Sequence, residues 1–137
     1  MTNWSPMQAV ARMLQTFYGS FGLRAYPEQS VPDRDENGNE LEPPYITYSV
    51  AVPDWRSGNM LHHARVYWRS YSLSEVSAKA DEIAARIGEG ITLSSQDGYI
   101  TLAPGQPFMQ YQPTDEMDEI KIVYINMEMG GYIRRKG

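Results

Sequence analysis

The sequence contains no cysteine among its 137 residues. This absence excludes disulfide bonds, thiol nucleophiles, zinc–thiolate sites and iron–sulfur clusters, and it fits a reducing compartment. Histidine is scarce too, because the chain has only His62 and His63. Neighbouring residues of a strand point to opposite faces of a sheet, so we expect both histidines to be structural rather than to share a metal or a substrate. No G-x-S-x-G elbow is present, and we predict neither catalysis nor a bound cofactor.

The sequence also lacks an excess of basic residues and any apolar run of membrane-spanning length. Lys and Arg total 12 against 17 Asp and Glu, a net charge of −5, whereas dedicated nucleic-acid binders present a basic surface. No stretch approaches the roughly 20 apolar residues of a membrane helix, and the N-terminus lacks the pattern of a secretory signal. In contrast, ten tyrosines, eight methionines and three tryptophans are present, and such side chains are enriched at protein–protein interfaces.

The length predicts a single domain over residues 1–137. Ser5 and Gln8 are spaced as a capping box, Pro6 suits the first helical position, and Gly19 is a stop signal. These residues predict an N-terminal helix. Its expected apolar face consists of Met7, Val10, Ala11, Leu14, Phe17 and Tyr18.

Residues 60–91 predict a strand followed by a second helix. Alternation over residues 61–71 is typical of a half-buried strand, and Ser72 and Glu75 match a capping box for the helix after it. Gly88 ends that helix. We expect Trp68 to be buried against its apolar face, which consists of Val76, Ala80, Ile83, Ala84 and Ile87.

The remaining strands are predicted from short alternating or β-branched runs between turn residues. They are expected at residues 23–26, 45–52, 91–93, 99–102 and 120–129, with a turn at Pro104 and Gly105, an extended segment at 108–112 and a C-terminal tail at 130–137. The order is α-β-β-β-α-β-β-β. Because most strands are joined by short turns, the predicted fold is α+β, a mostly antiparallel sheet with two packed helices.

Residues 28–43, the acidic loop, show no periodicity. Residues 33–38 match the first half of a calcium loop, D-x-D-x-N-G, but Glu40 and Pro44 do not continue the ligand pattern. We therefore interpret the segment as a solvated loop with an Asn-Gly turn, while ion binding stays open. The carboxylates of Asp115, Glu116, Asp118 and Glu119 are likewise interpreted as a solvated turn.

Five segments carry a family resemblance when they are taken in order. They are PPYITYSV at 43–50, ARVYWRSYS at 64–72, the helix pattern ending at Ile87, GYITLAPGQPFMQ at 98–110 and DEIKIVYINMEMGGY at 118–132. Together they resemble the tail terminator, or tail completion, proteins of siphophages and their prophages. The resemblance covers roughly residues 43–132, and the N-terminal helix is compatible with it.

The resemblance implies a structural protein that forms a hexameric ring on the head-proximal end of the tail tube, stops tube polymerisation and offers a docking surface for the head–neck connector. Its implied partners are further copies of itself, the tube protein and the connector or stopper, with DNA only passing through the lumen and no membrane. The implied location is the neck of the virion tail, assembled in the host cytoplasm. The residues expected at assembly contacts are Asp33, Asp35, Glu36, Glu40, Glu42, Arg134 and Arg135.

Two alternatives stay open at the level of sequence. One is another neck component, a stopper or an adaptor. The other is a small ligand-binding or enzymatic α+β domain that uses its acidic loops, which a deep pocket with convergent polar groups would favour. The C-terminal basic cluster, which begins at Arg134, is also open to a plainer interpretation as a solvated tail.

Overall fold

The computed structural model describes residues 5–54, 56, 58–113 and 119–134. Its elements are α1 (Pro6–Tyr18), β1 (Arg24–Pro27), β2 (Tyr45–Tyr48), β3 (Met60–Arg69), α2 (Ser74–Ile87), β4 (Ile91–Ser95), β5 (Gly98–Tyr111) and β6 (Ile120–Ile133). Two short 3₁₀ helices, η1 (Gly19–Phe21) and η2 (Glu28–Ser30), lie on either side of β1. The α+β class and the predicted order of helices and strands are confirmed.

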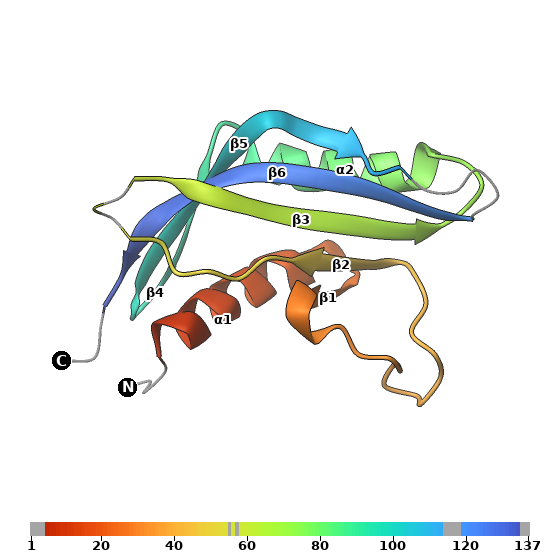
Figure 1. The fold of residues 1–137 in the computed structure, drawn as a ribbon, viewed down its shortest axis with the longest axis horizontal. Helices are drawn as coiled ribbons and strands as arrows, with labels where there is room; N and C mark the ends of the chain where they lie inside the picture. Colours follow the sequence, from red (N-terminus) through yellow and green to blue (C-terminus); the bar gives the residue numbers. More distant parts are fainter. Residues whose placement is uncertain (1–4, 55, 57, 114–118, 135–137) are drawn as a thin grey trace.

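The six strands form one curled sheet in the order β1-β2-β3-β6-β5-β4 (Figure 1). Every neighbouring pair is antiparallel except β1 and β2, which are parallel. The long strands β3, β5 and β6 form the middle of the sheet, with α2 behind them and α1 below (Figure 1). The described residues contain no helix with the length and apolar composition needed to span a bilayer.

The two helices pack on the same face of the sheet. In β3 the alternate residues His62, Ala64 and Val66 are buried, and they join the buried residues of α1 and α2 in one core. Each fully buried Leu, Ile or Met side chain stabilises such a core by about 1.5–3 kcal/mol. The opposite face, to which His63, Arg65 and Tyr67 point, is covered by neither helix.

The start of α1 is confirmed in detail, but its buried face differs from the prediction. The Ser5 hydroxyl accepts from the Gln8 amide, and the Gln8 side chain accepts from the Ser5 amide. Met7 is 50% exposed and Ala11 is only half-buried. The buried face of α1 consists of adjacent pairs of residues, and successive pairs are four residues apart, which widens the contact with the sheet. These residues are Ala9, Val10, Met13, Leu14, Phe17 and Tyr18.

The predicted capping box at the start of α2 is wrong. Leu73 is the N-cap residue, and the carboxylate of Glu75 instead accepts a hydrogen bond of 2.7 Å from the indole Nε1 of Trp68. The prediction that Trp68 is buried is wrong as well, since its side chain is only half-buried at the edge of the core. An indole N–H needs a polar partner, which explains why Trp68 lies where Glu75 can reach it.

Strands β5 and β6 extend well beyond their predicted bounds. β5 continues through Pro104 and Gly105, where a turn was expected. Its register with β6 jumps there, because Pro104 pairs with Met127 and Met109 pairs with Ile125, so the residues between them form a bulge. β6 continues to Ile133, so residues 130–133, half of the predicted tail, belong to the strand. In contrast, β2 is shorter than expected and ends at Tyr48.

Candidate assembly interface

The acidic loop contains a short hairpin-like turn that holds itself together. Arg34 and Glu40 form an antiparallel bridge, and the Leu41 amide donates to the Asp33 carbonyl at 2.9 Å. Oδ1 of Asp35 accepts hydrogen bonds from the backbone amides of Asn37 and Asn39, at 2.9 and 3.0 Å. Residues 33–41 are therefore a defined structure, the acidic turn, although the sequence showed no periodicity there. The side chain of Asp35 thus stabilises the turn by accepting hydrogen bonds from the backbone that follows it.

The acidic loop carries the whole net charge of the protein. Residues 28–43 contain six carboxylates and one arginine, a charge of −5. The rest of the chain contains 11 acidic and 11 basic residues, so its charges balance. Asp33, Glu36 and Glu40 are exposed, and no described residue pairs with their carboxylates. The field of the molecule is thus strongly negative at one place.

Glu42 lies at the base of the loop and is engaged with its own chain. Its backbone carbonyl accepts a hydrogen bond from the Arg24 guanidinium at 2.7 Å. Its carboxylate lies 3.8 Å from the Arg69 guanidinium. Arg69 also pairs with Glu119, the one described member of the predicted second acidic cluster. Asp115, Glu116 and Asp118 lie outside the described residues. Of the predicted assembly acids, Glu42 is therefore the least available to a partner.

The predicted basic contacts lie far from the acidic turn. Arg134 is exposed directly after β6, and its amide donates to the Asp97 carbonyl at 2.7 Å in the turn between β4 and β5. Arg135 lies outside the described residues. The acidic turn and the end of β6 project toward opposite ends of the long axis (Figure 1). The structure therefore separates the predicted assembly residues into two surfaces.

The sheet face that the helices leave uncovered carries an aromatic surface that sequence reasoning did not single out. The rings of Tyr45 and Tyr67 stack with centroids 4.7 Å apart, and Tyr26 meets Tyr45 edge to face at 6.2 Å. Ile122, opposite Tyr67, is 8% exposed although it lies outside the main core. Burial, and next the neighbouring Tyr67, raise the pKa of Tyr45. The alternation of β3, which places Tyr67 on the same face as His63 and Arg65, was the signal that could have found this face.

A polar network lies beside the tyrosines and ties η2 to the sheet. Nε2 of His63 lies 2.6 Å from Oε2 of Glu28, and Nη1 of Arg65 lies 3.2 Å from the same oxygen. Arg65 also donates to Gln112 at 3.0 Å, and its guanidinium lies 4.6 Å from the ring centre of Tyr124. Because Glu28 is the first residue of the acidic loop, this network fixes where the loop leaves the body.

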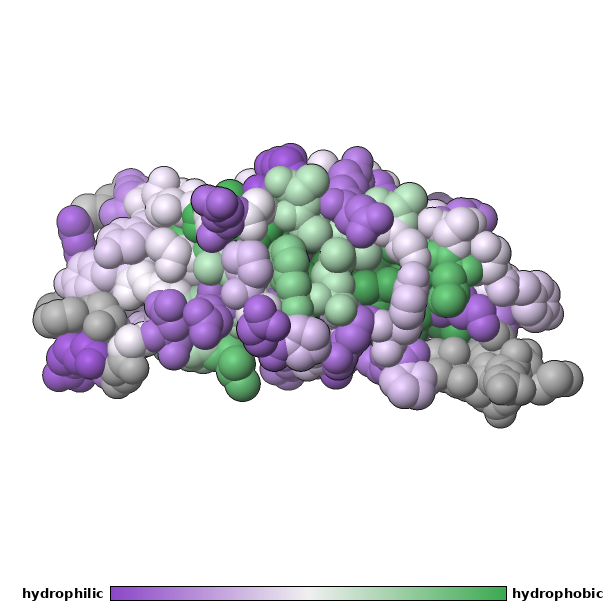
Figure 2. Space-filling model, turned by 90° about the horizontal axis from the view of Figure 1, so that it is seen from above, coloured by the Kyte–Doolittle hydropathy of each residue, from purple (hydrophilic) through white to green (hydrophobic). Residues whose placement is uncertain are grey.

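Apolar side chains lie along the middle of the face that is seen from above in Figure 2, between polar ones. This face is formed by the elements that lie uppermost in Figure 1.

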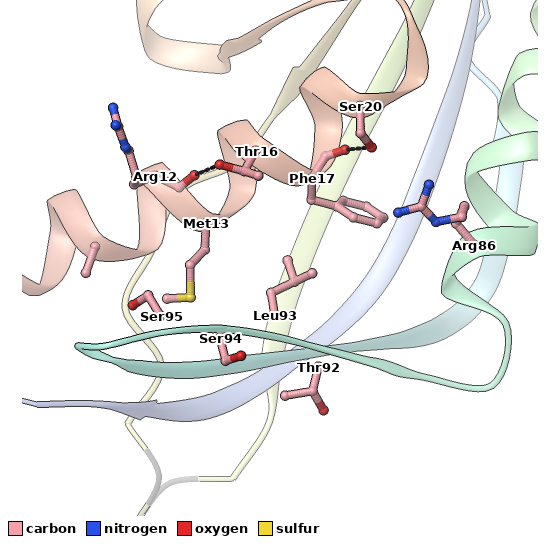
Figure 3. Close-up of a pocket in the computed structure, with 11 residues that line it drawn as sticks. Arg12, Met13, Thr16, Phe17, Ser20, Arg86, Thr92, Leu93, Ser94 and Ser95 are labelled. Atoms are coloured by element: carbon pink, nitrogen blue, oxygen red, sulfur yellow. Dashed lines mark hydrogen bonds between the residues drawn. The ribbon is translucent and has the colours of Figure 1, made fainter.

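Two shallow grooves lie beside the helices. One, of about 190 Å³, lies between α2 and β5 and is lined in part by Ala80, Met109 and Val123. A second groove, of about 390 Å³, lies between α1, β4 and the end of α2 (Figure 3). It is lined by Ala9, Arg12, Met13, Thr16, Phe17, Ser20, Arg86, Thr92, Leu93, Ser94 and Ser95.

The described residues contain no group of three or more His, Asp or Glu side chains placed to hold a metal ion. His62 and His63 point to opposite faces of the sheet, as predicted. No protein-family model matches the chain, and no curated protein matches it. The candidate assembly interface comprises three surfaces: the acidic turn, the aromatic sheet face and the groove between α1 and β4.

Proposed function

We propose that this protein is a siphophage or prophage tail terminator, which forms a ring on the head-proximal end of the tail tube, stops its polymerisation and receives the head–neck connector. The resemblance of the ordered segments in residues 43–132 names the family. The α+β fold is compatible with it, and the exposed features of the molecule are those of a protein that works through contacts with other proteins.

The observation that carries the proposal is the separation of charge along the molecule. All of the net negative charge lies in the acidic loop, and the groove with Arg86 lies on the other side of the fold. Two different complementary surfaces on one chain support head-to-tail contacts, which generate closed rings when the rotation between copies closes. A self-complementary dimer would instead use one surface twice.

The aromatic sheet face supports a second contact in the same assembly. Tyr26, Tyr45 and Tyr67 offer amphipathic rings next to Arg65 and Tyr124, a composition typical of protein interfaces. In a ring between tube and connector, each copy needs axial contacts besides the contacts to its two neighbours. We assign this face to one of the axial partners. The acidic balance suits a conduit that does not retain DNA.

The experiment that tests the function is removal of the protein from an assembling phage. Without it, tail tubes should exceed their normal length and fail to join filled heads, and the protein supplied separately should restore both properties. Loss of a stopper or an adaptor predicts a different result, in which tails have their normal length and only head joining fails. Heads and tails that join normally without the chain would contradict every neck function.

A further inference from the structure

The groove between α1 and β4 has a composition that fits a negatively charged occupant. Its 11 lining residues include two arginines and five hydroxyl side chains but no carboxylate. Met13, Phe17 and Leu93 give it an apolar floor. We propose that this groove receives the acidic turn of a neighbouring copy of the same chain, so that successive copies join head to tail. The proposal rests on the ring assembly proposed above and specifies its contact.

Arg86 is the residue of the groove best placed to bind a carboxylate. It extends from α2 toward the ring of Phe17, whereas Arg12 points away from the cavity at the rim (Figure 3). The Arg86 guanidinium lies 5.9 Å from the ring centre of Phe17 and 5.4 Å from that of Phe21. Among the described residues no carboxylate pairs with it, in contrast to Arg65 and Arg69, which bind Glu28 and Glu119. A guanidinium held against aromatic rings keeps its N–H donors available for a bidentate carboxylate.

The acidic turn has the complementary properties. Asp33, Glu36 and Glu40 are exposed and unpaired among the described residues, and Arg34 donates to the Gly38 carbonyl of its own turn at 2.9 Å. Because the turn already has its internal hydrogen bonds, little conformational entropy is lost when a partner receives it. The exposed hydroxyls of Ser94 and Ser95, which line the groove, can donate to a further carboxylate.

The acidic turn and the groove lie too far apart to meet within one chain, so a contact between them joins two copies. In Figure 1 the acidic turn projects from the end of the molecule that carries β1 and β2, whereas α1 meets β4 toward the opposite end. One chain therefore presents the turn at one end and the groove at the other. Repeating this contact adds copies in one direction, and closure yields a ring.

Site-specific disulfide formation tests the contact, since the protein has no cysteine of its own. The test variant carries Glu36→Cys and Ser94→Cys, both at exposed positions. The control carries Glu36→Cys with Ser74→Cys, an exposed serine at the start of α2 that does not line the groove. Concentrated protein is oxidised, and the linked peptides are identified by mass spectrometry after denaturing electrophoresis.

We expect the 36–94 disulfide between copies in a ladder of covalent oligomers, with a yield about 10-fold above the 36–74 control because docking raises the local concentration of the pair. Adding Arg86→Glu to the test variant should lower the yield to that of the control, and adding Glu40→Lys to that charge-reversed variant should restore part of it. A 36–94 yield equal to that of the control, or one unaffected by Arg86→Glu, overturns the docking.

The same experiment separates this proposal from the proposed function. If native mass spectrometry finds rings of the unmodified protein but no 36–94 link forms, the docking is wrong and the ring stands. If the link forms but phage tails mature normally without the protein, the contact is real and the tail function is wrong. Circular dichroism of each variant verifies that the fold is retained.

Discussion

The hydroxyl oxygen of Tyr18 on α1 lies 2.9 Å from Nε2 of His62 on β3, inside the core. The other imidazole nitrogen, Nδ1, lies 3.0 Å from the Ser49 hydroxyl, so both nitrogens have polar partners. Burial, and next the adjacent His63, lower the pKa of His62 to about 3. Burial, together with Tyr48, raises the pKa of Tyr18 well above its ordinary value. The first helix is thus joined to the sheet through a neutral hydrogen-bonded pair.

This pair predicts a pH-dependent stability. Between pH 6.5 and about 3 the unfolded state binds a proton at His62 and the folded state does not, so the free energy of unfolding falls as the pH falls. For this residue alone the loss between pH 7 and pH 5 is about 2 kcal/mol. Urea unfolding of the wild type and of His62→Gln at both pH values measures it. The variant should be less stable at pH 7, but its free energy of unfolding should fall less between pH 7 and pH 5 than that of the wild type. An equal fall in both proteins would contradict this role of His62.

Trp68 should contribute less to stability than a residue of the central core. Ile83→Ala, at a fully buried position of α2, is expected to lower the free energy of unfolding by about 3–4 kcal/mol. Trp68→Ala should cost about 2 kcal/mol, because its side chain is only partly buried at the edge of the core. Trp68→Phe, which removes the bond to Glu75, should cost about 1 kcal/mol. Chemical unfolding gives the order, and a Trp68→Ala cost above that of Ile83→Ala would place the indole in the core after all.

The Ser5 capping box and the alternation of β3 could be predicted because they depend on residues a few positions apart. The matching pattern at Ser72 and Glu75 misled, because its glutamate has a competing partner in Trp68, seven residues earlier near the end of β3. The four-residue capping pattern does not include this competitor. The parallel pairing of β1 with β2 was not predicted, although the long connection over residues 28–44 permits it, since parallel strands need a crossover of about a dozen residues or more.

The acidic residues of the candidate interface could be predicted from the sequence, but their arrangement could not. Charge and loop length singled out residues 28–43, while the hydrogen bonds of Asp35 that shape the turn became visible only in the structure. The groove could not be predicted, because it depends on how α1 packs against β4 and on where Arg86 points. The predicted strand ended at residue 129, whereas Gly130 and Gly131 belong to β6 and permit its close pairing with β5.

Gly131 should be intolerant of any side chain. A Cβ there would overlap the carbonyl oxygen of Tyr99 and approach within 2.7 Å of the Ile100 Cα, and the residue has φ +134°. Gly131→Ala is expected to lower the free energy of unfolding by about 2–4 kcal/mol through backbone strain and overpacking between β5 and β6.

Gly19→Ala provides the matched control for that substitution. Gly19 has φ −71°, and an added Cβ would lie 3.8 Å from its nearest neighbour. This change should be neutral or stabilising by about 0.4–1 kcal/mol, because alanine restricts the unfolded chain. Thermal and chemical unfolding of the two variants should therefore differ in sign or by several kcal/mol. Similar small effects in both would show that β5 and β6 are not paired in this register.

The acidic turn should be separable from the fold. Replacing residues 33–41 with a short Gly-Ser segment removes only contacts within the turn and retains Glu28 and Glu42, which bind the body. The melting temperature should change little, while tails made with this variant lose length control or fail to join heads. Infectious particles with normal tails would show that the turn is dispensable. Calcium that stabilises the intact protein but not the shortened one would show that the turn binds an ion.

Electron microscopy of the assembled particle tests the central claim most directly. Averaged images of tails that carry this protein, with the chain located by a bound antibody fragment, should show a single six-fold layer of it on the head-proximal end of the tube. The acidic turn of each copy should lie against the α1 and β4 groove of the next. Particles without such a layer, or with this protein at another level of the virion, would contradict the account.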